Sequence, residues 1–328
     1  MGVQSLRTLY IDQGFSPQVV ELMLSAKRDS THKQYNTYIS AWLDYCKKHQ
    51  VSPSAPTIPQ ALDFLECLRV DRNLGYNAMN TARSALSSLL PHLDGIPFGQ
   101  NSHVKLYMRG TFNTSPPKPR YHSTWDPDVV LKLLKDWSPV DTLDLKKLTL
   151  KLLMLILLVS GQRISTILLL SIDCLQISDS YATFHVFDML KQSRPGYTNP
   201  VVKLRVYDRD VDLCVVSILQ TYLSRTSSIR KDTKSLFVTL RPPHTGAAKD
   251  TLTRWVRTVM STAGIDTNVF RPHSVRAAST SAAKRGGATV AEILGNAGWT
   301  TTSTFTRFYN KPVLDTSRYD VAILGNKI

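Results

Sequence analysis

The sequence has few cysteines and no long apolar segment. Its four cysteines, Cys46, Cys67, Cys174 and Cys214, form no C-x-x-C pair. This spacing disfavours a disulfide framework and a zinc site and fits a reducing, intracellular setting. The richest apolar run, Leu152 to Val159, follows Lys151 and is too short to span a bilayer. We expect a buried helix there and no membrane contact.

Acidic residues are scarce relative to basic ones. The chain holds 40 lysines and arginines against 25 acids, a formal net charge of +15, which indicates a polyanionic partner. On charge alone, DNA, RNA and an acidic membrane surface all remain open. The excess is uneven, since residues 1–112 hold 11 basic and 8 acidic residues and residues 125–328 hold 27 and 17. Most of the phosphate-attracting charge therefore lies in the second half.

Helical patterns dominate residues 1–112. One short helix is expected within residues 1–25, starting at Ser16-Pro17, and a longer one has Ser30 as its cap. Aromatic residues at helical spacing along the longer helix are expected in a core rather than as platforms for bases; they include Tyr35, Tyr38 and Trp42. Further helices are predicted over residues 60–71, 77–93 and 104–112. Together they predict a small all-helical domain.

Residues 113–124, N-T-S-P-P-K-P-R-Y-H-S-T, form a predicted linker. Three prolines and two basic residues favour an extended, solvated connector between two domains. It is either a plain spacer or a segment that also touches phosphate, and we favour the second interpretation.

The second half, residues 125–328, mixes helices with two β-rich runs. Helices are predicted over 125–137, 143–160, 212–226 and 249–263, and a short strand or buried segment over 235–239. The runs 181–187 and 201–207 flank strong turn residues and predict a hairpin. The expected fold is therefore mainly α with a small antiparallel β-sheet (α+β).

Three alternate acids, Asp208, Asp210 and Asp212, invite a metal interpretation. No glycine or distal glutamate completes a calcium loop around them, and nothing else supplies a two-metal nuclease site. We expect neither a metal nor another cofactor.

The most informative stretch runs from Arg271 to Tyr309 and gathers His273, Arg276, Trp299 and Tyr309. Arginine offers a planar fork to phosphate, histidine shuttles protons, tryptophan donates one N–H and tyrosine can attack as a nucleophile. A helix opening at Pro272, a second over 289–294 that ends near Gly295, and a third segment bearing Tyr309 can bring these groups to one pocket.

These residues resemble the late signature of the tyrosine recombinase (phage integrase) family: His-x-x-Arg, then a Leu-Gly-x element with His or Trp, then the nucleophilic Tyr. The resemblance implies a helical core-binding DNA-binding domain over residues 1–112 and a catalytic domain over 125–328. Trp299 and the ending T-F-T-R-F-Y-N-K-P look most like recombinases of eukaryotic mobile elements, the DIRS-like and crypton groups. That subgroup implies a nuclear location.

The same resemblance assigns two earlier residues. Gly161-Gln162-Arg163 matches the family's first catalytic arginine, and Lys191, on a turn of the hairpin, matches its catalytic lysine better than Lys203 does. Many members carry an acid three residues after that arginine, where this chain has Thr166. The step from Trp299 to Tyr309 is one residue longer than in the commonest pattern, which would put Phe308 in register unless the helix start shifts. Tyr319, in the tail, is a weaker candidate for the nucleophile because no motif surrounds it.

The implied activity is site-specific cleavage and rejoining of double-stranded DNA through a 3′-phosphotyrosyl intermediate, for integration or excision of a mobile element, without metal or ATP. The residues implied are Arg163, Lys191, His273, Arg276, Trp299 and Tyr309. Strand exchange implies self-association into a DNA-bound tetramer, with the tail 313–328 packing on a neighbour. Two alternatives remain open: a type IB topoisomerase-like enzyme or hairpin resolvase, and a non-catalytic, domesticated DNA-binding protein.

Overall fold

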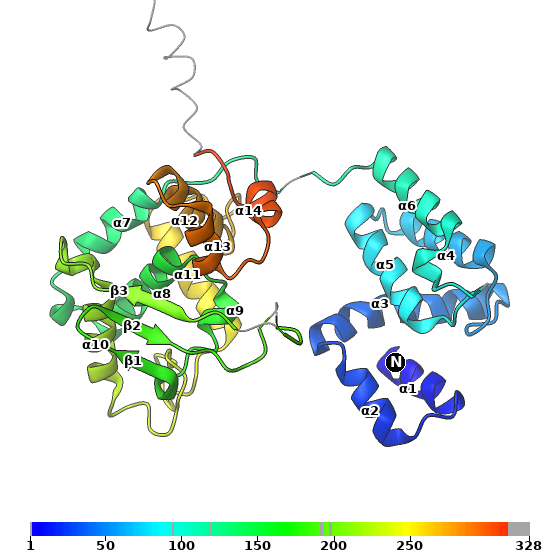
Figure 1. Ribbon diagram of the computed structural model, residues 1–328, viewed down its shortest axis with the longest axis horizontal. Coiled ribbons are helices and arrows are strands. Elements are labelled where there is room, and N and C mark those ends of the chain that lie inside the picture. The colour runs from blue at the N-terminus through cyan, green and yellow to red at the C-terminus, as the bar shows by residue number, and fades with distance from the viewer. Residues whose placement is uncertain (1, 94, 119, 191–192, 197–198, 314–328) are drawn as a thin grey trace, which may run out of the picture. The chain divides into compact units, whose positions relative to one another are not determined.

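The computed structural model describes residues 2–93, 95–118, 120–190, 193–196 and 199–313. The chain divides into two compact units, Met1–Lys118 and Pro119–Ile328, each with its own hydrophobic core (Figure 1). The division falls inside the segment 113–124 that the sequence marks as a linker. The described part is mainly helical with a small antiparallel sheet, so the predicted fold class is confirmed.

The first unit is all-helical in its described residues. Its elements are α1 (Gly2–Asp12), α2 (Pro17–Ser25), α3 (Asp29–His49), α4 (Ile58–Asp71), α5 (Tyr76–Leu89), the 3-10 turn η1 (Phe98–Gln100) and α6 (Ser102–Thr114). Trp42 of α3 is fully buried, packs edge-to-face on Phe64 and donates its indole N–H to the Pro53 carbonyl. The aromatic face of α3 thus belongs to the core, as predicted.

Three local predictions for this unit are wrong. Residues 1–25 form two helices rather than one, because α1 precedes the helix that starts at Pro17. Arg28, not Ser30, occupies the cap position of α3. Helix α5 ends at Leu89 rather than at residue 93, since the chain then enters the Leu93–Ile96 bridge.

The second unit surrounds one long buried helix. Its helices are α7 (Pro127–Asp136), α8 (Leu145–Ser160), α9 (Ile164–Ile167), α10 (Val215–Thr226), α11 (Lys249–Thr262), α12 (Ser274–Arg285), α13 (Val290–Ala297) and α14 (Thr302–Phe308). Helix α8 contacts α10, α11 and α12 and the last strand of the sheet. Its side chains are buried nearly all the way round, which confirms the predicted buried helix.

Lys151 shows how complete the burial of α8 is. Its side chain has no exposed surface, and its ammonium donates a hydrogen bond of 2.6 Å to the Trp137 carbonyl. Burial lowers the pKa of Lys151 below the ordinary lysine value. None of the helices in the described residues combines the length and the apolar composition needed to cross a bilayer.

The sheet consists of β1 (Leu175–Ile177), β2 (Tyr181–Phe184) and β3 (Val202–Arg205) in the order β1-β2-β3 (Figure 1). All pairings are antiparallel, with Leu175 opposite Phe184 and Tyr181 opposite Arg205. The predicted hairpin of β2 and β3 is confirmed, although both strands are shorter than the β-rich runs. The short strand β1 was not predicted.

Gly161 ends α8 and lies against Thr280 and Ser279 of α12. It has a positive φ of 60°, and a Cβ there would lie 3.1 Å from Thr280 Cγ2. Gly264, after α11, also has a positive φ, of 81°, but a Cβ there would meet nothing within 4 Å. The two glycines share the backbone constraint and differ in crowding.

We expect Gly264→Ala to destabilise the chain by about 1–2 kcal/mol, the cost of a left-handed backbone for an L-residue. Gly161→Ala should cost more, since the added methyl also presses on Thr280 of α12. Thermal denaturation of both full-length variants measures the difference. Equal losses would mean that α12 yields freely to the added methyl.

Candidate active site

Arg163 enters the site from the end of α8. After Gly161, the chain runs through the buried Gln162, and Arg163 takes the cap position of α9 with its side chain partly exposed. Gln162 donates a side-chain hydrogen bond of 2.5 Å to the Asn296 carbonyl of α13. The segment that delivers Arg163 is therefore attached to the helix before Trp299.

Arg276 lies in the first turn of α12 and is 2% exposed. Its two terminal nitrogens donate to the carbonyls of Gly161, at 2.9 Å, and of Ala297, at 2.7 Å. Its Nε is buried and has no hydrogen-bond partner among the described residues. The guanidinium stands 4.1 Å from the ring centre of Trp299 and 5.4 Å from that of Tyr309.

The electrostatics of Arg276 reflect burial beside a second cation. Burial, followed by the positive charge of Arg163, lowers the pKa of Arg276 to about 9, and Tyr309 acts in the opposite direction. A buried cation near another cation is unfavourable unless an anion neutralises it. The pair thus has the electrostatic character of an anion site.

Trp299 follows α13, whose start is fixed by a capping box of Thr289 and Glu292. The predicted end of this helix near Gly295 is wrong. The helix runs to Ala297, because Gly298 supplies the left-handed cap with a φ of 66°. Trp299 is 8% exposed, and its Nε1 is buried with no partner in the described part of the chain. The indole therefore keeps one unused donor.

Tyr309 caps the C-terminal end of α14 and turns its ring inward. Its hydroxyl lies 3.0 Å from His273 Nε2, and its ring centre lies 4.6 Å from that of Trp299. Phe308 is 57% exposed. Tyr309, not Phe308, is therefore the residue in register with the other groups.

His273 lies directly before α12 and is exposed. The helix begins at Ser274, two residues after the predicted start at Pro272, because the first bonds of this segment are turn-like, such as Ser274 N to the Arg271 carbonyl. Both His273 and Arg276 still lie against Tyr309, as the three-residue spacing predicts.

Ser281 fixes the backbone around Tyr309. Its hydroxyl donates to the Tyr309 carbonyl at 2.6 Å and accepts from the Lys311 amide at 3.0 Å. The Thr124 amide donates to the Pro312 carbonyl two residues beyond Asn310. The segment that carries the phenol is thus attached on both sides, to α12 and to the start of the second unit.

Two further contacts hold the start of α12, and sequence reasoning missed them. The Trp125 indole donates to Ser274 Oγ at 2.9 Å, and the Arg271 amide donates to Tyr121 Oη at 3.1 Å. Each pair is separated by about 150 positions along the chain, so no local pattern could have identified it.

The structure brings together Arg163, His273, Arg276, Trp299 and Tyr309, while Lys191 lies outside the described residues. Lys203, the second lysine considered, is exposed on β3 with its ammonium 3.6 Å from the centre of the Tyr181 ring. Thr166, in the position of the expected acid, is 1% exposed. Its amide donates to the Arg163 carbonyl at 2.8 Å.

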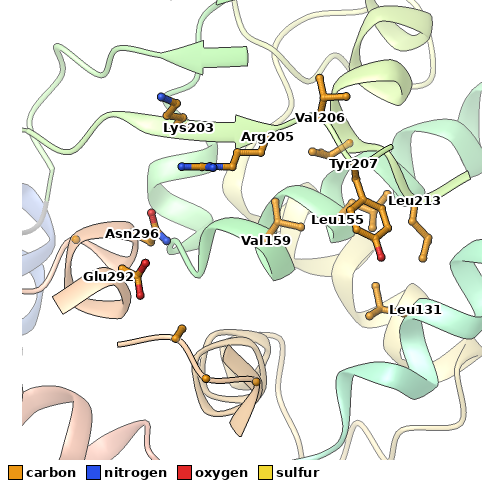
Figure 2. A pocket seen from close by; sticks show the side chains of 15 residues that line it. Leu131, Leu155, Val159, Lys203, Arg205, Val206, Tyr207, Leu213, Glu292 and Asn296 are labelled. Carbon is orange, nitrogen blue, oxygen red and sulfur yellow. The ribbon is translucent and has the colours of Figure 1, made fainter. Parts of the chain in front are cut away.

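A hollow of about 980 Å³ separates β3 from α13 (Figure 2). Lys203 and Arg205 of β3 lie at one end of it with Glu292 and Asn296 of α13, and Tyr207 lies at the other end. Apolar side chains form the middle, among them Leu155 and Val159 of α8. The cationic side chains of Lys203 and Arg205 thus lie next to α13, the helix that precedes Trp299.

Of the three alternate acids, Asp210 has a structural role. Asp210 accepts the Asp212 amide and pairs with Lys135 at 2.8 Å, and this lysine holds the pKa of Asp210 below its usual value. No group of three or more metal-ligating side chains occurs among the residues described.

Several solved structures share this fold. XerH site-specific recombinase bound to palindromic difH substrate is 15% identical, with 93% of this chain and 82% of that chain covered and a TM-score of 0.62. The Tn1549 transposon integrase with transposon right end DNA is 13% identical, with 99% of both chains covered and a TM-score of 0.57. A lambda integrase dimer bound to a COC′ core site is 17% identical, covers 89% and 75%, and has a TM-score of 0.53.

At these identities the likeness shows the fold alone. No curated protein sequence was found to match the chain. The profile described as "Phage integrase family" matches residues 125–312, more than half of the chain. The sequence resemblance is therefore confirmed, and the chain belongs to the phage integrase family, the tyrosine recombinases.

Proposed function

We propose that the chain is a site-specific DNA recombinase that cleaves and rejoins duplex DNA through a 3′-phosphotyrosyl intermediate. The observation that carries the proposal is the 3.0 Å contact between the Tyr309 hydroxyl and His273 Nε2, beside the buried guanidinium of Arg276. A phenol with an imidazole in hydrogen-bond reach has the geometry of an activated nucleophile. Membership of the tyrosine recombinases supports the same chemistry.

Arg163 and Arg276 hold the scissile phosphate in the proposed reaction. The pKa of Arg276 is lowered by burial and by the charge of Arg163, so a phosphate between the two would offset an existing electrostatic cost. Charge that develops in the pentacoordinate transition state would meet both guanidinium groups, and that of Arg276, 2% exposed, lies where such interactions are strongest.

Tyr309 attacks the phosphorus, and the bond to the 5′ oxygen breaks. The phenol proton passes to His273 Nε2 at 3.0 Å, and the departing 5′ oxygen takes a proton from Lys191. Trp299 Nε1, which has no partner among the described residues, donates to a non-bridging oxygen. The reverse attack by a 5′-hydroxyl of another duplex exchanges the strands.

The covalent link retains the energy of the diester, so the proposed cycle needs neither metal nor ATP. Exchange between two duplexes requires several copies on DNA, and we include a DNA-bound tetramer in the proposal. A lambda integrase tetramer bound to a Holliday junction, 17% identical with a TM-score of 0.50, has the same fold.

In this proposal, the enzyme integrates or excises a mobile genetic element. The Tn1549 integrase, which shares the fold, was solved with transposon right end DNA. Trp299 and the ending T-F-T-R-F-Y-N-K-P support the DIRS-like and crypton recombinases as the subgroup, with a nuclear location.

The nucleophile assignment predicts that Tyr309→Phe binds DNA with unchanged affinity and forms no covalent adduct, since only the attacking oxygen is lost. The assay is a suicide duplex, nicked near the scissile phosphate and carrying the terminal repeats of the parent element, incubated in EDTA. The matched control is Tyr207→Phe, a half-exposed tyrosine of the same unit, which should retain the adduct.

The same assay separates the alternatives. An undiminished adduct from Tyr309→Phe would remove Tyr309 from the reaction. If the unmodified chain relaxes a supercoiled plasmid that lacks the target site, a topoisomerase-like enzyme would be favoured. Clear binding without any adduct from the unmodified chain would favour a non-catalytic DNA-binding protein.

The donor assignment of Trp299 makes a second prediction. Trp299→Phe should keep the ring stacked on Arg276 and slow adduct formation about 100-fold, the typical cost of removing one oxyanion donor. Trp299→His should recover part of the rate because imidazole supplies an N–H. Single-turnover adduct kinetics measure both variants; equal rates for Phe and His would indicate a packing role only.

A further inference from the structure

A short segment at the start of the second unit contacts both halves of the candidate active site. Residues 121–125, the strap, lie outside the helices and the three-stranded sheet. One half of the site is the turn 270–274, which carries His273. The other is the segment 309–313, which begins with Tyr309. The two residues are 36 positions apart along the chain, so their 3.0 Å contact depends on what holds these two pieces.

Tyr121 of the strap anchors the turn ahead of His273. Its hydroxyl accepts the Arg271 amide at 3.1 Å, and its ring packs on Phe270 with centroids 5.6 Å apart. These residues precede α12, which begins at Ser274, so their position depends on contacts outside the regular helix.

Trp125 of the strap anchors the residue that follows His273. Its indole donates to Ser274 Oγ at 2.9 Å, and the two residues are 5% and 2% exposed. A buried hydrogen bond that loses one partner leaves the other unsatisfied, so this contact is costly to break. His273 therefore lies between two anchored points.

The same strap holds the chain beyond Tyr309. The Thr124 amide donates to the Pro312 carbonyl at 2.7 Å, and Thr124 pairs with Val313 in a parallel bridge. Thr124 is 1% exposed, so this bond lies in a low-dielectric environment where it is strong. One segment thus reaches both pieces of the site, the first through side chains and the second through its backbone.

We propose that Tyr121 and Trp125 are positioning residues for the reaction at Tyr309, an inference that rests on the proposed function. They act through His273 and Tyr309 rather than on the phosphate. The strap sets the separation of Tyr309 Oη and His273 Nε2, and with it the geometry of the attack. Groups that are held in the reacting geometry gain rate, and a misplacement of about 1 Å can cost about 100-fold.

The test deletes one hydrogen-bonding group at a time and keeps an aromatic ring. Trp125→Phe removes the indole N–H, and Tyr121→Phe removes the hydroxyl that accepts the Arg271 amide. Duplex affinity should stay unchanged, while the single-turnover rate of adduct formation at saturating suicide duplex should fall about 10- to 100-fold. Trp137→Phe and Tyr207→Phe, the same substitutions in the same unit outside the strap, should leave this rate unchanged.

A double-mutant cycle separates positioning from a general loss of stability. Ser274→Ala removes the acceptor of the Trp125 indole. If this bond positions the turn, the double variant Trp125→Phe/Ser274→Ala should be no slower than the slower single variant. Rates are measured below the melting temperature of each variant, and if Trp125→Phe does not fold, Tyr121→Phe carries the test.

Three results of these measurements would overturn the proposal. They are multiplied losses in the double variant, an unchanged rate in either strap variant, and weaker DNA binding with an unchanged rate at saturation. The last result would make the strap a DNA contact rather than a support of the active site.

Amide hydrogen exchange of the DNA-free chain provides an arm that needs no cleavage. Both strap variants should exchange faster in peptides covering 270–276 and 302–313, and the two control variants should not. Faster exchange with no adduct from any chain would remove the recombinase and leave the strap as the support of the His273–Tyr309 pair. An adduct from the unmodified chain, with rate and exchange unchanged in the strap variants, would do the reverse.

Discussion

The buried guanidinium of Arg276 is the contact on which the second unit's functional face depends. It donates to the carbonyls of Gly161 and Ala297, which lie at the C-terminal ends of α8 and α13. Such carbonyls have no partner within their own helices and carry the negative end of the helix dipole. One cation thereby satisfies two helix ends and fixes their distance from α12.

Arg276 therefore has both a structural role, joining two helix ends, and a proposed role in binding phosphate. The same helix ends lead directly into Arg163 and Trp299, so the contact that closes the core also sets the spacing of the proposed phosphate ligands. Stacking against Trp299 at 4.1 Å restricts the guanidinium further, and its unpaired Nε leaves the group incompletely satisfied. In the proposed reaction, these contacts position the guanidinium before a phosphate binds, which is the condition for electrostatic stabilisation without reorganisation.

The order and spacing of residues were enough to predict the fold class and the meeting of His273, Arg276, Trp299 and Tyr309. Their separations place them on successive helix ends, which a sequence displays directly. The sequence alone could not decide whether Tyr309 or Phe308 lies in register with the other groups. The register depends on where α14 begins and on the hydrogen bond from Ser281 to the Tyr309 carbonyl. Contacts such as Trp125 with Ser274 join distant positions and leave no periodic signal.

Thr166 changes the charge balance of the site. Family members with an acid at this position have a negative charge beside the first arginine, whereas here the residue is neutral and 1% exposed. The titrating groups that shift the pKa of Arg276 are Arg163, which lowers it, and Tyr309, which raises it, and neither is a carboxylate. In the proposed reaction, a bound phosphate would neutralise the two guanidinium groups, and no carboxylate among the groups that shift the pKa of Arg276 would compete with it.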